Sequence, residues 1–598
     1  MTAAEWAARM GGDGFCEFVP AHICLFLAMP CQRCYNPVII WNDFALEGMR
    51  VYLKLNGIEI ECTGQERWID LLDRLPDGGV GALGIALRGR TASLNDPVEE
   101  YTFAKTLTYA DEEGRRIYER SLQFVFLTAA NRLYPGKRVR IRHSLAQGLY
   151  IDLPNVAVTG TVVDDLKAEM KRIVAADMPI ERISVSTEDA RDYFTRTGQT
   201  DRLRILGYRR FSHFTLYRID TLEDYFYGEM APTTGCLGVF DLKAYGEGIL
   251  LHLPDVKNPK KPSRFVDLPH LLHTYDEAAR WHAILNCENA ADLNDMVVSR
   301  RLREFIRVNE ALQERRIQQI ADQFVASGAL LLLIAGPSSS GKTTFSHRMS
   351  IALRVQGLRP VKVSLDDYYL DRDSIPREPD GSLDLERIET LDLELLCDHL
   401  PRLLRGETVN VPEFDFRSGM RREATHPFTV EPGQPIIIEG IHALNDRLTA
   451  TIPPKMKFKV YISPLTMLNL DDHNRIRTTD ARLLRRIVRD NLFRGTPPED
   501  TMAMWASVRR GEEKYIFPFQ EKADTMFNSA LTYELAIMKK YAYPQLLSVT
   551  EESPWYTMAR RLVKFLNYIQ TADVEDEIPV NSILREFIGG CCFYKDED

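Results

Sequence analysis

A glycine-rich loop between a strand-like and a helix-like segment constrains the fold of this 598-residue chain more than any other feature. The loop reads Gly336-Pro-Ser-Ser-Ser-Gly-Lys-Thr-Thr344 and satisfies the pattern G-x-x-x-x-G-K-[ST]. The apolar run Leu331–Ala335 before it predicts a strand covered on both faces, as in a parallel sheet, and Phe345–Val355 can continue as a helix. Strand, loop and helix in this order predict an α/β domain that binds a nucleotide.

Each part of the loop has a physical role in holding phosphate. Gly336 and Gly341 permit the tight turn that lets backbone N–H groups surround phosphate oxygens, and the helix that follows adds the positive end of its dipole. Lys342 can reach the β- and γ-phosphates, and the Thr343 hydroxyl can ligate Mg²⁺, so we expect ATP and Mg²⁺ as cofactors. The residues expected to bind the nucleotide form one unbroken run: Gly336, Pro337, Ser338, Ser339, Ser340, Gly341, Lys342, Thr343 and Thr344.

Two further apolar segments end in carboxylates. Val361–Leu365 leads into Asp366, and Pro435–Ile438 leads into Glu439. Residues just beyond the carboxyl ends of parallel strands face the ligand crevice, so both carboxylates are expected near the loop. Asp366 can accept the proton of a substrate hydroxyl during phosphoryl transfer, although a helix-capping Asp is the alternative interpretation. Glu439 can hold Mg²⁺ or its water.

The stretch between residues 475 and 510 is dense in cations. Its arginines are Arg475, Arg477, Arg482, Arg485, Arg486, Arg489, Arg494, Arg509 and Arg510. An amphipathic surface helix would interleave more acidic residues among them. A lid over a triphosphate needs cations that neutralise charge in the transition state, so we expect this stretch to form one, with structural salt bridges accounting for several of the arginines.

The overall composition excludes several classes of protein. The chain has 75 Lys+Arg against 85 Asp+Glu, a net charge of −10 and a pI near 5.8, which argues against nucleic acid as the main partner. Its apolar run Ala329–Ala335 is far shorter than the roughly 20 residues of a membrane helix, so no membrane partner is expected. Ten cysteines are too sparse for a disulfide scaffold, and we predict a reducing, cytoplasmic location.

The same region resembles a known family. The segments that carry the likeness are Gly336-Pro-Ser-Ser-Ser-Gly-Lys-Thr-Thr344, Ser364-Leu-Asp-Asp-Tyr-Tyr369, Val411-Pro-Glu-Phe-Asp-Phe416, Ile438-Glu-Gly440 and Arg485-Arg-Ile-Val-Arg-Asp490. In order over about residues 329–545, they resemble the uridine kinase/phosphoribulokinase family. The resemblance implies an ATP-dependent kinase that phosphorylates a small-molecule hydroxyl, with a nucleoside 5′-hydroxyl as the first choice of acceptor.

The resemblance also implies roles for individual residues. Asp366 matches the general base, and Arg485 and Arg489 match a phosphate-facing lid that acts with Lys342 in catalysis. The residues that match acceptor-contacting positions are Tyr369, Asp384, Phe414, Asp415 and Phe416. Uridine kinases usually place a pyrimidine-reading His shortly after that aromatic segment, where this chain has Arg417-Ser-Gly-Met420. Another sugar or alcohol is therefore the alternative acceptor.

Residues 51–254 resemble the N-terminal portion of threonyl-tRNA synthetase, a TGS module followed by an editing domain. The likeness lies in Asp111-Glu-Glu-Gly-Arg-Arg-Ile-Tyr118, Arg132-Leu-Tyr-Pro135, Gly148-Leu-Tyr-Ile-Asp152 and Ala231-Pro-Thr-Thr-Gly235. The editing residues are replaced by Arg120, Phe124, Phe226 and Met230, which cannot ligate zinc or perform that acid–base chemistry. We therefore expect a scaffold that binds RNA or a regulatory ligand, and an RNA-binding regulatory NTPase is the rival function.

These patterns predict the organisation of the chain. We expect a disordered or mis-annotated extension (1–48, with Met49 as the biological start), a β-grasp-like TGS module (49–110), an editing-like α+β domain (111–254), a helical connector (255–328) and an α/β P-loop kinase domain (329–598) with a parallel sheet flanked by helices. Alternation around Asn56-Gly57 predicts a hairpin, and Asp111–Leu133 has the period of an amphipathic helix.

Overall fold

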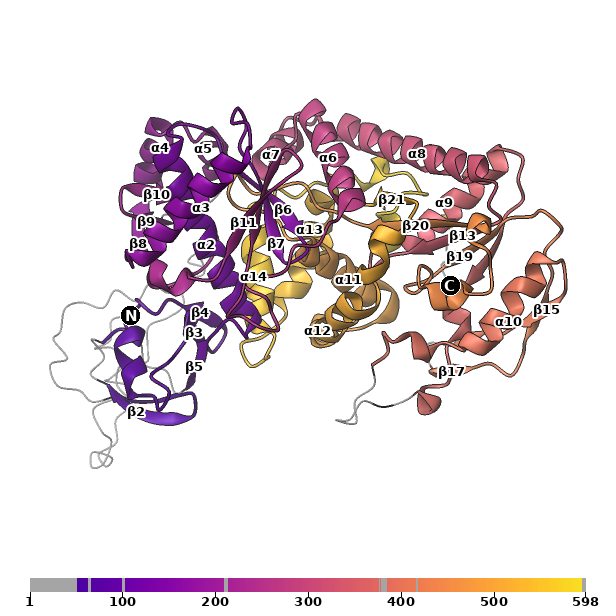
Figure 1. Ribbon diagram of the computed structural model, residues 1–598, viewed down its shortest axis with the longest axis horizontal. Coiled ribbons are helices and arrows are strands. Elements are labelled where there is room, and N and C mark those ends of the chain that lie inside the picture. Colours follow the sequence, from indigo (N-terminus) through magenta and orange to yellow (C-terminus); the bar gives the residue numbers. More distant parts are fainter. Residues whose placement is uncertain are drawn as a thin grey trace, which may run out of the picture. The chain divides into compact units, whose positions relative to one another are not determined.

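The computed structural model describes residues 51–62, 66–98, 103–208, 213–375, 377, 384–415 and 418–593 (Figure 1). The predicted extension 1–48 and the predicted acceptor contact Phe416 lie outside these residues. From Val51 onward the chain forms one compact unit. The domain boundaries within it stay predictions.

The first module is a five-stranded sheet in the order β2-β1-β5-β3-β4. Its strands are β1 (Val51–Leu55), β2 (Ile58–Cys62), β3 (Gly84–Leu87), β4 (Arg90–Ala92) and β5 (Phe103–Leu107). The predicted hairpin is confirmed, because β1 and β2 pair antiparallel around Asn56 and Gly57, both of which have positive φ. A 3-10 helix, Trp68–Arg74, contributes Trp68 and Leu71 to the core of the module.

The second module places helices against two antiparallel sheets. The strands are β6 (Arg140–Leu145), β7 (Gly148–Asp152), β8 (Glu181–Ser186), β9 (His213–Ile219), β10 (Leu222–Asp224), β11 (Asp241–Tyr245) and β12 (Gly248–His252), and the helices are α2 (Glu112–Leu133), α3 (Gly160–Ala175), α4 (Thr187–Arg196) and α5 (Thr200–Leu206). The long helix predicted at Asp111–Leu133 is confirmed as α2. Phe124 and Phe226, at two of the positions that match editing residues, lie in contact in its apolar core, with ring centroids 5.0 Å apart.

Three helices, α6 (Pro269–Ile284), α7 (Ala290–Val298) and α8 (Leu302–Ser327), connect this module to the last one. The last module contains a five-stranded parallel sheet in the order β14-β19-β13-β20-β21. Its strands are β13 (Leu331–Ala335), β14 (Val361–Ser364), β19 (Ile436–Glu439), β20 (Lys457–Ser463) and β21 (Thr525–Asn528). The predicted parallel sheet is therefore confirmed.

Helices cover both faces of this sheet (Figure 1). The helices of this module are α9 (Lys342–Val355), α10 (Leu393–Leu404), α11 (Thr478–Arg494), α12 (Pro498–Tyr515), α13 (Glu534–Leu547), α14 (Tyr556–Leu566) and α15 (Arg585–Ile588). Side chains of β13 alternate between the faces: Leu332 and Ile334 join the core formed with α8 and α9, whereas Leu331 and Leu333 join the core formed with α6 and α10. All five residues of β13 are buried, which explains why the strand reads as a continuous apolar run.

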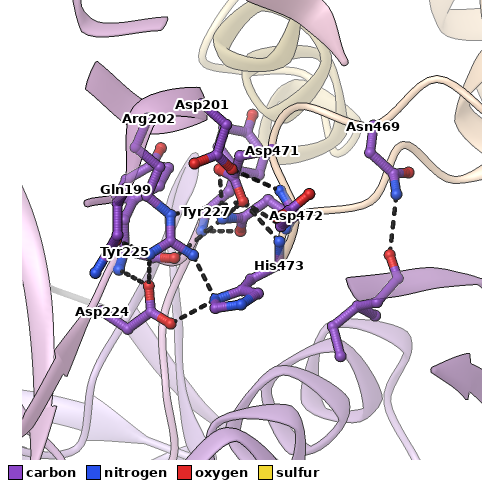
Figure 2. A network of polar contacts seen from close by, with 12 residues as sticks. Gln199, Asp201, Arg202, Asp224, Tyr225, Tyr227, Asn469, Asp471, Asp472 and His473 are labelled. Atoms are coloured by element: carbon purple, nitrogen blue, oxygen red, sulfur yellow. Dashed lines mark hydrogen bonds and ion pairs between the residues drawn. The ribbon is translucent and has the colours of Figure 1, made fainter. Parts of the chain in front are cut away.

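A polar network joins the second module to the loop Asn469–Arg475, which precedes α11 (Figure 2). The buried Arg202 of α5 pairs with Asp224 of β10 at 2.5 Å, and Asp224 lies 2.6 Å from the Nδ1 atom of His473. The Asn469 side-chain amide donates to the Ile141 carbonyl at 2.9 Å. The front half therefore holds both ends of the loop that leads into α11.

Glu119 of α2 contributes to the same junction, where it contacts Arg475 at 2.8 Å and Arg477 at 2.9 Å. Burial opposes its ionisation, but the two arginines outweigh burial and hold its pKa at about 2. Because this pKa lies below that of the unfolded chain, the stabilisation is present above about pH 4.3 and is lost as pH falls toward 2.

Glu119→Gln is expected to lower the free energy of unfolding at pH 7 by up to about 3 kcal/mol. Unfolding followed from pH 7 to pH 2 should show a shallower acid dependence for the variant, since the titrating carboxylate is gone. Glu181→Gln removes an exposed pair with Arg218 and is the control. Equal acid dependence of the Glu119 variant and the parent would contradict the assignment.

Candidate nucleotide-binding site

The glycine-rich loop lies at the carboxyl end of β13 and runs directly into α9. A Cβ atom on Gly336 would lie 2.0 Å from the Ile462 carbonyl oxygen of β20, so only glycine fits between the two strands. Gly341 has a φ of +84°, and a Cβ atom there would lie 2.5 Å from Ile583, in a segment after the last long helix. Both glycines are thus required by the backbone path of the loop.

The interior of the loop presents polar groups without partners. Ser339 has a positive φ of 59°, and the hydroxyl groups of Ser339 and Ser340 are buried with no hydrogen-bond partner among the described residues. Lys342 folds back, and its ammonium group donates to the Pro337 carbonyl at 3.2 Å. Buried hydroxyls with free donor capacity beside an ammonium group suit phosphate oxygens, so these residues fit the nucleotide that the sequence predicts.

Thr343 and Glu439 lie together, with the threonine hydroxyl donating to the carboxylate at 3.1 Å. Parallel pairing of β13 with β19 brings them together, because Glu439 ends β19 and Thr343 lies in the loop-to-helix segment that follows β13. Burial and the neighbouring Asp366 raise the pKa of Glu439 to about 7, against the opposing charge of Lys342. The described residues include no cluster of three or more His, Cys, Asp or Glu able to hold a metal ion. One hydroxyl and one carboxylate suit Mg²⁺, whose remaining ligands are phosphate oxygens and water.

Asp366 lies just beyond β14, in the first turn of the 3-10 helix Leu365–Tyr368. The cap of this helix is Ser364, whose hydroxyl accepts a hydrogen bond from the Asp366 N–H at 3.2 Å, so the Asp366 carboxylate is not used for capping. Asp366 is an exposed residue, but protein atoms around its carboxyl group partly desolvate it, and this raises its pKa. The positive charges of Lys342 and Arg494 oppose the shift. The site therefore brings this carboxylate into the electrostatic range of the loop lysine.

The predicted acceptor contacts are only partly brought together. Tyr369 and Phe414 pack with ring centroids 5.6 Å apart, and Phe414 and Asp415 form β16 (Phe414–Asp415), paired with β17 (Met420–Arg421). Asp384 instead accepts a hydrogen bond from the Tyr515 hydroxyl of α12 at 3.0 Å. Tyr369 of this aromatic pair thus lies within range of the Asp366 charge, whereas Asp384 lies against α12.

The two arginines expected in a phosphate-facing lid both pair with carboxylates of the protein. Arg485 is fully buried and pairs with Glu534 at 2.5 Å, while donating to the Ser529 carbonyl at 2.9 Å. Arg489 pairs with its neighbour Asp490 at 2.7 Å. The Nη1 group of Arg485 also donates to the Ser339 carbonyl of the glycine-rich loop at 3.4 Å. The buried Arg485 therefore supports the loop backbone.

Two glutamates at the loop were missed by sequence reasoning. Glu512 accepts a hydrogen bond from the Ser338 N–H at 3.1 Å and forms a buried pair with Arg482. Glu586 accepts from the Thr344 N–H at 3.2 Å and from its hydroxyl at 2.7 Å. Glu512 lies in a charged run near the expected lid, but nothing around Glu586 signals a nucleotide site. A carboxylate on these donors occupies positions that phosphate oxygens would use at a helix N-terminus.

Glu586→Gln is expected to tighten ATP binding by about tenfold, because a neutral amide competes less well than a carboxylate for the Thr344 donors. The dissociation constant can be measured by calorimetry with a non-hydrolysable ATP analogue. Glu577→Gln, in the same C-terminal segment but paired with Arg307, is the control. Unchanged affinity together with a lower melting temperature would show that Glu586 only caps α9.

Comparison with known proteins identifies the family. Residues 331–536 match the phosphoribulokinase/uridine kinase family. The uridine kinase of Macrococcus caseolyticus is 30% identical over 212 residues, which cover 35% of this chain and 93% of that protein. The chain belongs to this family. The uridine kinase of Bacillus pumilus is 31% identical over 199 residues, covering 33% of this chain and 85% of that protein. A structure of a possible uridine kinase from Bacillus stearothermophilus is 22% identical, covers 36% of this chain and 97% of that one, and has a TM-score of 0.25.

Membership of the kinase family applies to the C-terminal P-loop domain, and the family implies ATP as phosphoryl donor. The resemblance of residues 51–254 to synthetase modules stays a prediction. In the part of the chain that the structure describes, none of the helices combines the length and the apolar character needed to cross a bilayer.

Proposed function

We propose that the protein is an ATP-dependent kinase that transfers the γ-phosphoryl group to a small-molecule hydroxyl, with a nucleoside 5′-hydroxyl as acceptor. The observation that carries this proposal is the position of Asp366. Its carboxylate follows β14, is not used as a helix cap, and lies close enough to Lys342 for the two charges to interact. A kinase needs a base for the acceptor hydroxyl beside the cations that hold the triphosphate.

The residues divide the work of phosphoryl transfer between them. Backbone N–H groups of the loop and Lys342 would hold the β- and γ-phosphates, with the Ser339 and Ser340 hydroxyls available as further donors. Thr343 and Glu439 would hold Mg²⁺, which neutralises charge that develops on the phosphates. Asp366 would accept the proton as the acceptor oxygen attacks, and its raised pKa favours a carboxylate that can take up a proton.

The aromatic pair supports a nucleoside over a simple alcohol. Tyr369 and Phe414 are half-buried and pack together, and Tyr369 lies within range of the Asp366 charge; a base can stack on such rings. Arg417-Ser-Gly-Met420, the segment where uridine kinases usually place a pyrimidine-reading His, contains no histidine in this chain. We therefore propose a nucleoside without assigning uracil as its base. The front modules, 49–110 and 111–254, are proposed as a binding or regulatory scaffold.

The decisive experiment measures ATP consumption by the full chain against a panel of nucleosides, sugars and tRNA. We expect nucleosides to stimulate turnover and nucleoside 5′-monophosphate to accumulate in equal amount to ADP. Stimulation by a sugar alone would move the acceptor to that class. Stimulation by tRNA with a steep salt dependence, and no phosphorylated product, would replace the kinase assignment by a regulatory NTPase.

A further inference from the structure

A small cavity lies between α2, the loop before α11 and α14. Its volume is about 80 Å³. Arginines dominate the charged residues of its lining: Arg116, Arg120, Arg475, Arg477 and Arg561. Guanidinium groups from three separate elements therefore converge on one space, and none of them belongs to the phosphate loop.

Carboxylates neutralise only part of this cluster. Glu119 pairs with Arg475 and Arg477, and Asp480 pairs with Arg561 at 2.6 Å and lies 3.5 Å from Arg116. Arg116 is paired with Glu112 at 2.8 Å, and Glu113 lies within 3.6 Å of both Arg116 and Arg561. Among the described residues Arg120 forms no ion pair, and its guanidinium donates to the backbone carbonyl of Glu229. Four of the five arginines are thus ion-paired, and one of their partners, Glu112, is more than half exposed, whereas Glu113 and Glu229 act on Arg120 without forming an ion pair with it among the described residues.

Two of the five arginines have lowered pKa values, whereas the carboxylates around Arg116 outweigh burial and raise its pKa. Burial lowers the pKa of Arg120, although Glu113 and Glu229 oppose the shift. Burial together with repulsion from Arg116 and Arg475 lowers the pKa of Arg477 to about 9, despite the attraction of Glu119 and Asp480. A buried cation without full compensation is costly, and a bound anion removes that cost.

We propose that this cavity binds a phosphate group, either as orthophosphate or as the end of a small phosphomonoester. The guanidinium fork matches the geometry of phosphate oxygens, which favours this anion over a halide. A volume of about 80 Å³ accommodates one tetrahedral oxyanion, whereas drug-sized or nucleotide ligands fill cavities of roughly 300–1,000 Å³.

The site is connected to the nucleotide loop through α11. Arg477 is the residue immediately before α11, and Asp480 lies in the first turn of that helix. One to two turns later in the same helix, Arg482 donates to the Ser338 carbonyl at 2.8 Å and Arg485 donates to the Ser339 carbonyl. His473, in the loop that precedes α11, contacts Asp224 of the second module and also lines the cavity (Figure 2). A phosphate that fixes Arg477 is thus placed to change how firmly α11 holds the loop, and with it the affinity for ATP.

Calorimetric titration of the full chain tests the proposal, with orthophosphate and glycerol 3-phosphate as separate probes. A saturating non-hydrolysable ATP analogue keeps phosphate out of the glycine-rich loop, so the readout needs no turnover and does not depend on the kinase assignment. We expect one site, and we expect Arg120→Gln to weaken it by about 10- to 100-fold, the worth of a hydrogen bond to a charged group. Whichever probe binds more tightly identifies the source of the phosphate group.

Arg560→Gln, on the exposed side of α14 next to Arg561, should bind like the parent and is the matched control. Arg120→Lys, which keeps the charge, should retain part of the affinity and guards against a folding defect in the glutamine variant; the melting temperature of each variant is measured alongside. Equal binding by Arg120→Gln and the parent would overturn the proposal. It would also be overturned by the absence of binding of both probes, including the case in which only a 5′-phosphorylated RNA binds.

Discussion

Asp366→Asn is expected to lower kcat by about 10²–10⁴, the usual worth of a general base, with little change in the affinity for ATP. The asparagine keeps the size of the side chain but cannot accept the proton of the acceptor hydroxyl. ATP binding should survive because the loop residues and Lys342, not Asp366, hold the phosphates. Steady-state kinetics at saturating ATP and acceptor, combined with calorimetric ATP binding, measure the two quantities separately.

Asp367→Asn is the matched control, since Asp367 is the next residue in the same short helix and its pKa is also raised, to about 6, by burial and by Asp366. We expect this variant to keep most of the parental kcat, because Lys342 is not among the charges that act on Asp367. Near-normal turnover of Asp366→Asn would remove Asp366 as the base. Equal losses in both variants would instead indicate that the helix, and not one carboxylate, is needed.

Arg485→Met is expected to destabilise the protein by about 3–5 kcal/mol, because it leaves the buried carboxylate of Glu534 without its partner. Phe587 also loses the guanidinium that stacks on its ring, with 4.9 Å between the guanidinium carbon and the ring centroid. Thermal and denaturant unfolding measure the loss. The double variant Arg485→Met with Glu534→Met should recover most of the stability, since replacement of both members of a buried pair by apolar residues is often neutral.

Arg489→Met is the control that distinguishes loss of the buried Arg485–Glu534 pair from a general loss of positive charge on α11. Arg489 pairs with Asp490, which also receives Arg486 at 3.2 Å and Arg494 at 3.3 Å, so its loss is compensated. We expect a much smaller change in stability. If an Arg485 variant has the melting temperature of the parent but no phosphoryl transfer activity, the result would contradict the structural role and support the phosphate-facing lid that the sequence suggests.

The sequence predicts well those elements that are determined by residues close together in the chain. The strand Leu331–Ala335, the loop after it, the Asn56-Gly57 hairpin and the helix α2 each follow from residues that are close neighbours in the chain. Burial on both faces, positive φ and amphipathic period are local requirements, so the local pattern reveals them.

The ion-pair partners of the arginines in α11 could not be predicted from local sequence. Arg482 and Arg485 meet carboxylates that are 30 and 49 residues away in the sequence, and Glu586 reaches the loop over 242 residues. A cation that faces a bound triphosphate and a cation that faces a buried carboxylate look the same in a sequence. Only the tertiary pairing, set by the packing of α11 against α12 and α13, distinguishes them.

The C-terminal segment beyond the family match has a practical consequence for work on this protein. The match ends at residue 536, yet Ile583 packs against Gly341 and Glu586 binds Thr344. A kinase fragment that ends at the family boundary would therefore lack Ile583, which packs against the glycine-rich loop, and Glu586, whose carboxylate binds Thr344. ATP affinities obtained with such a fragment would describe a different binding site, and inhibitors selected on it would not transfer to the intact chain.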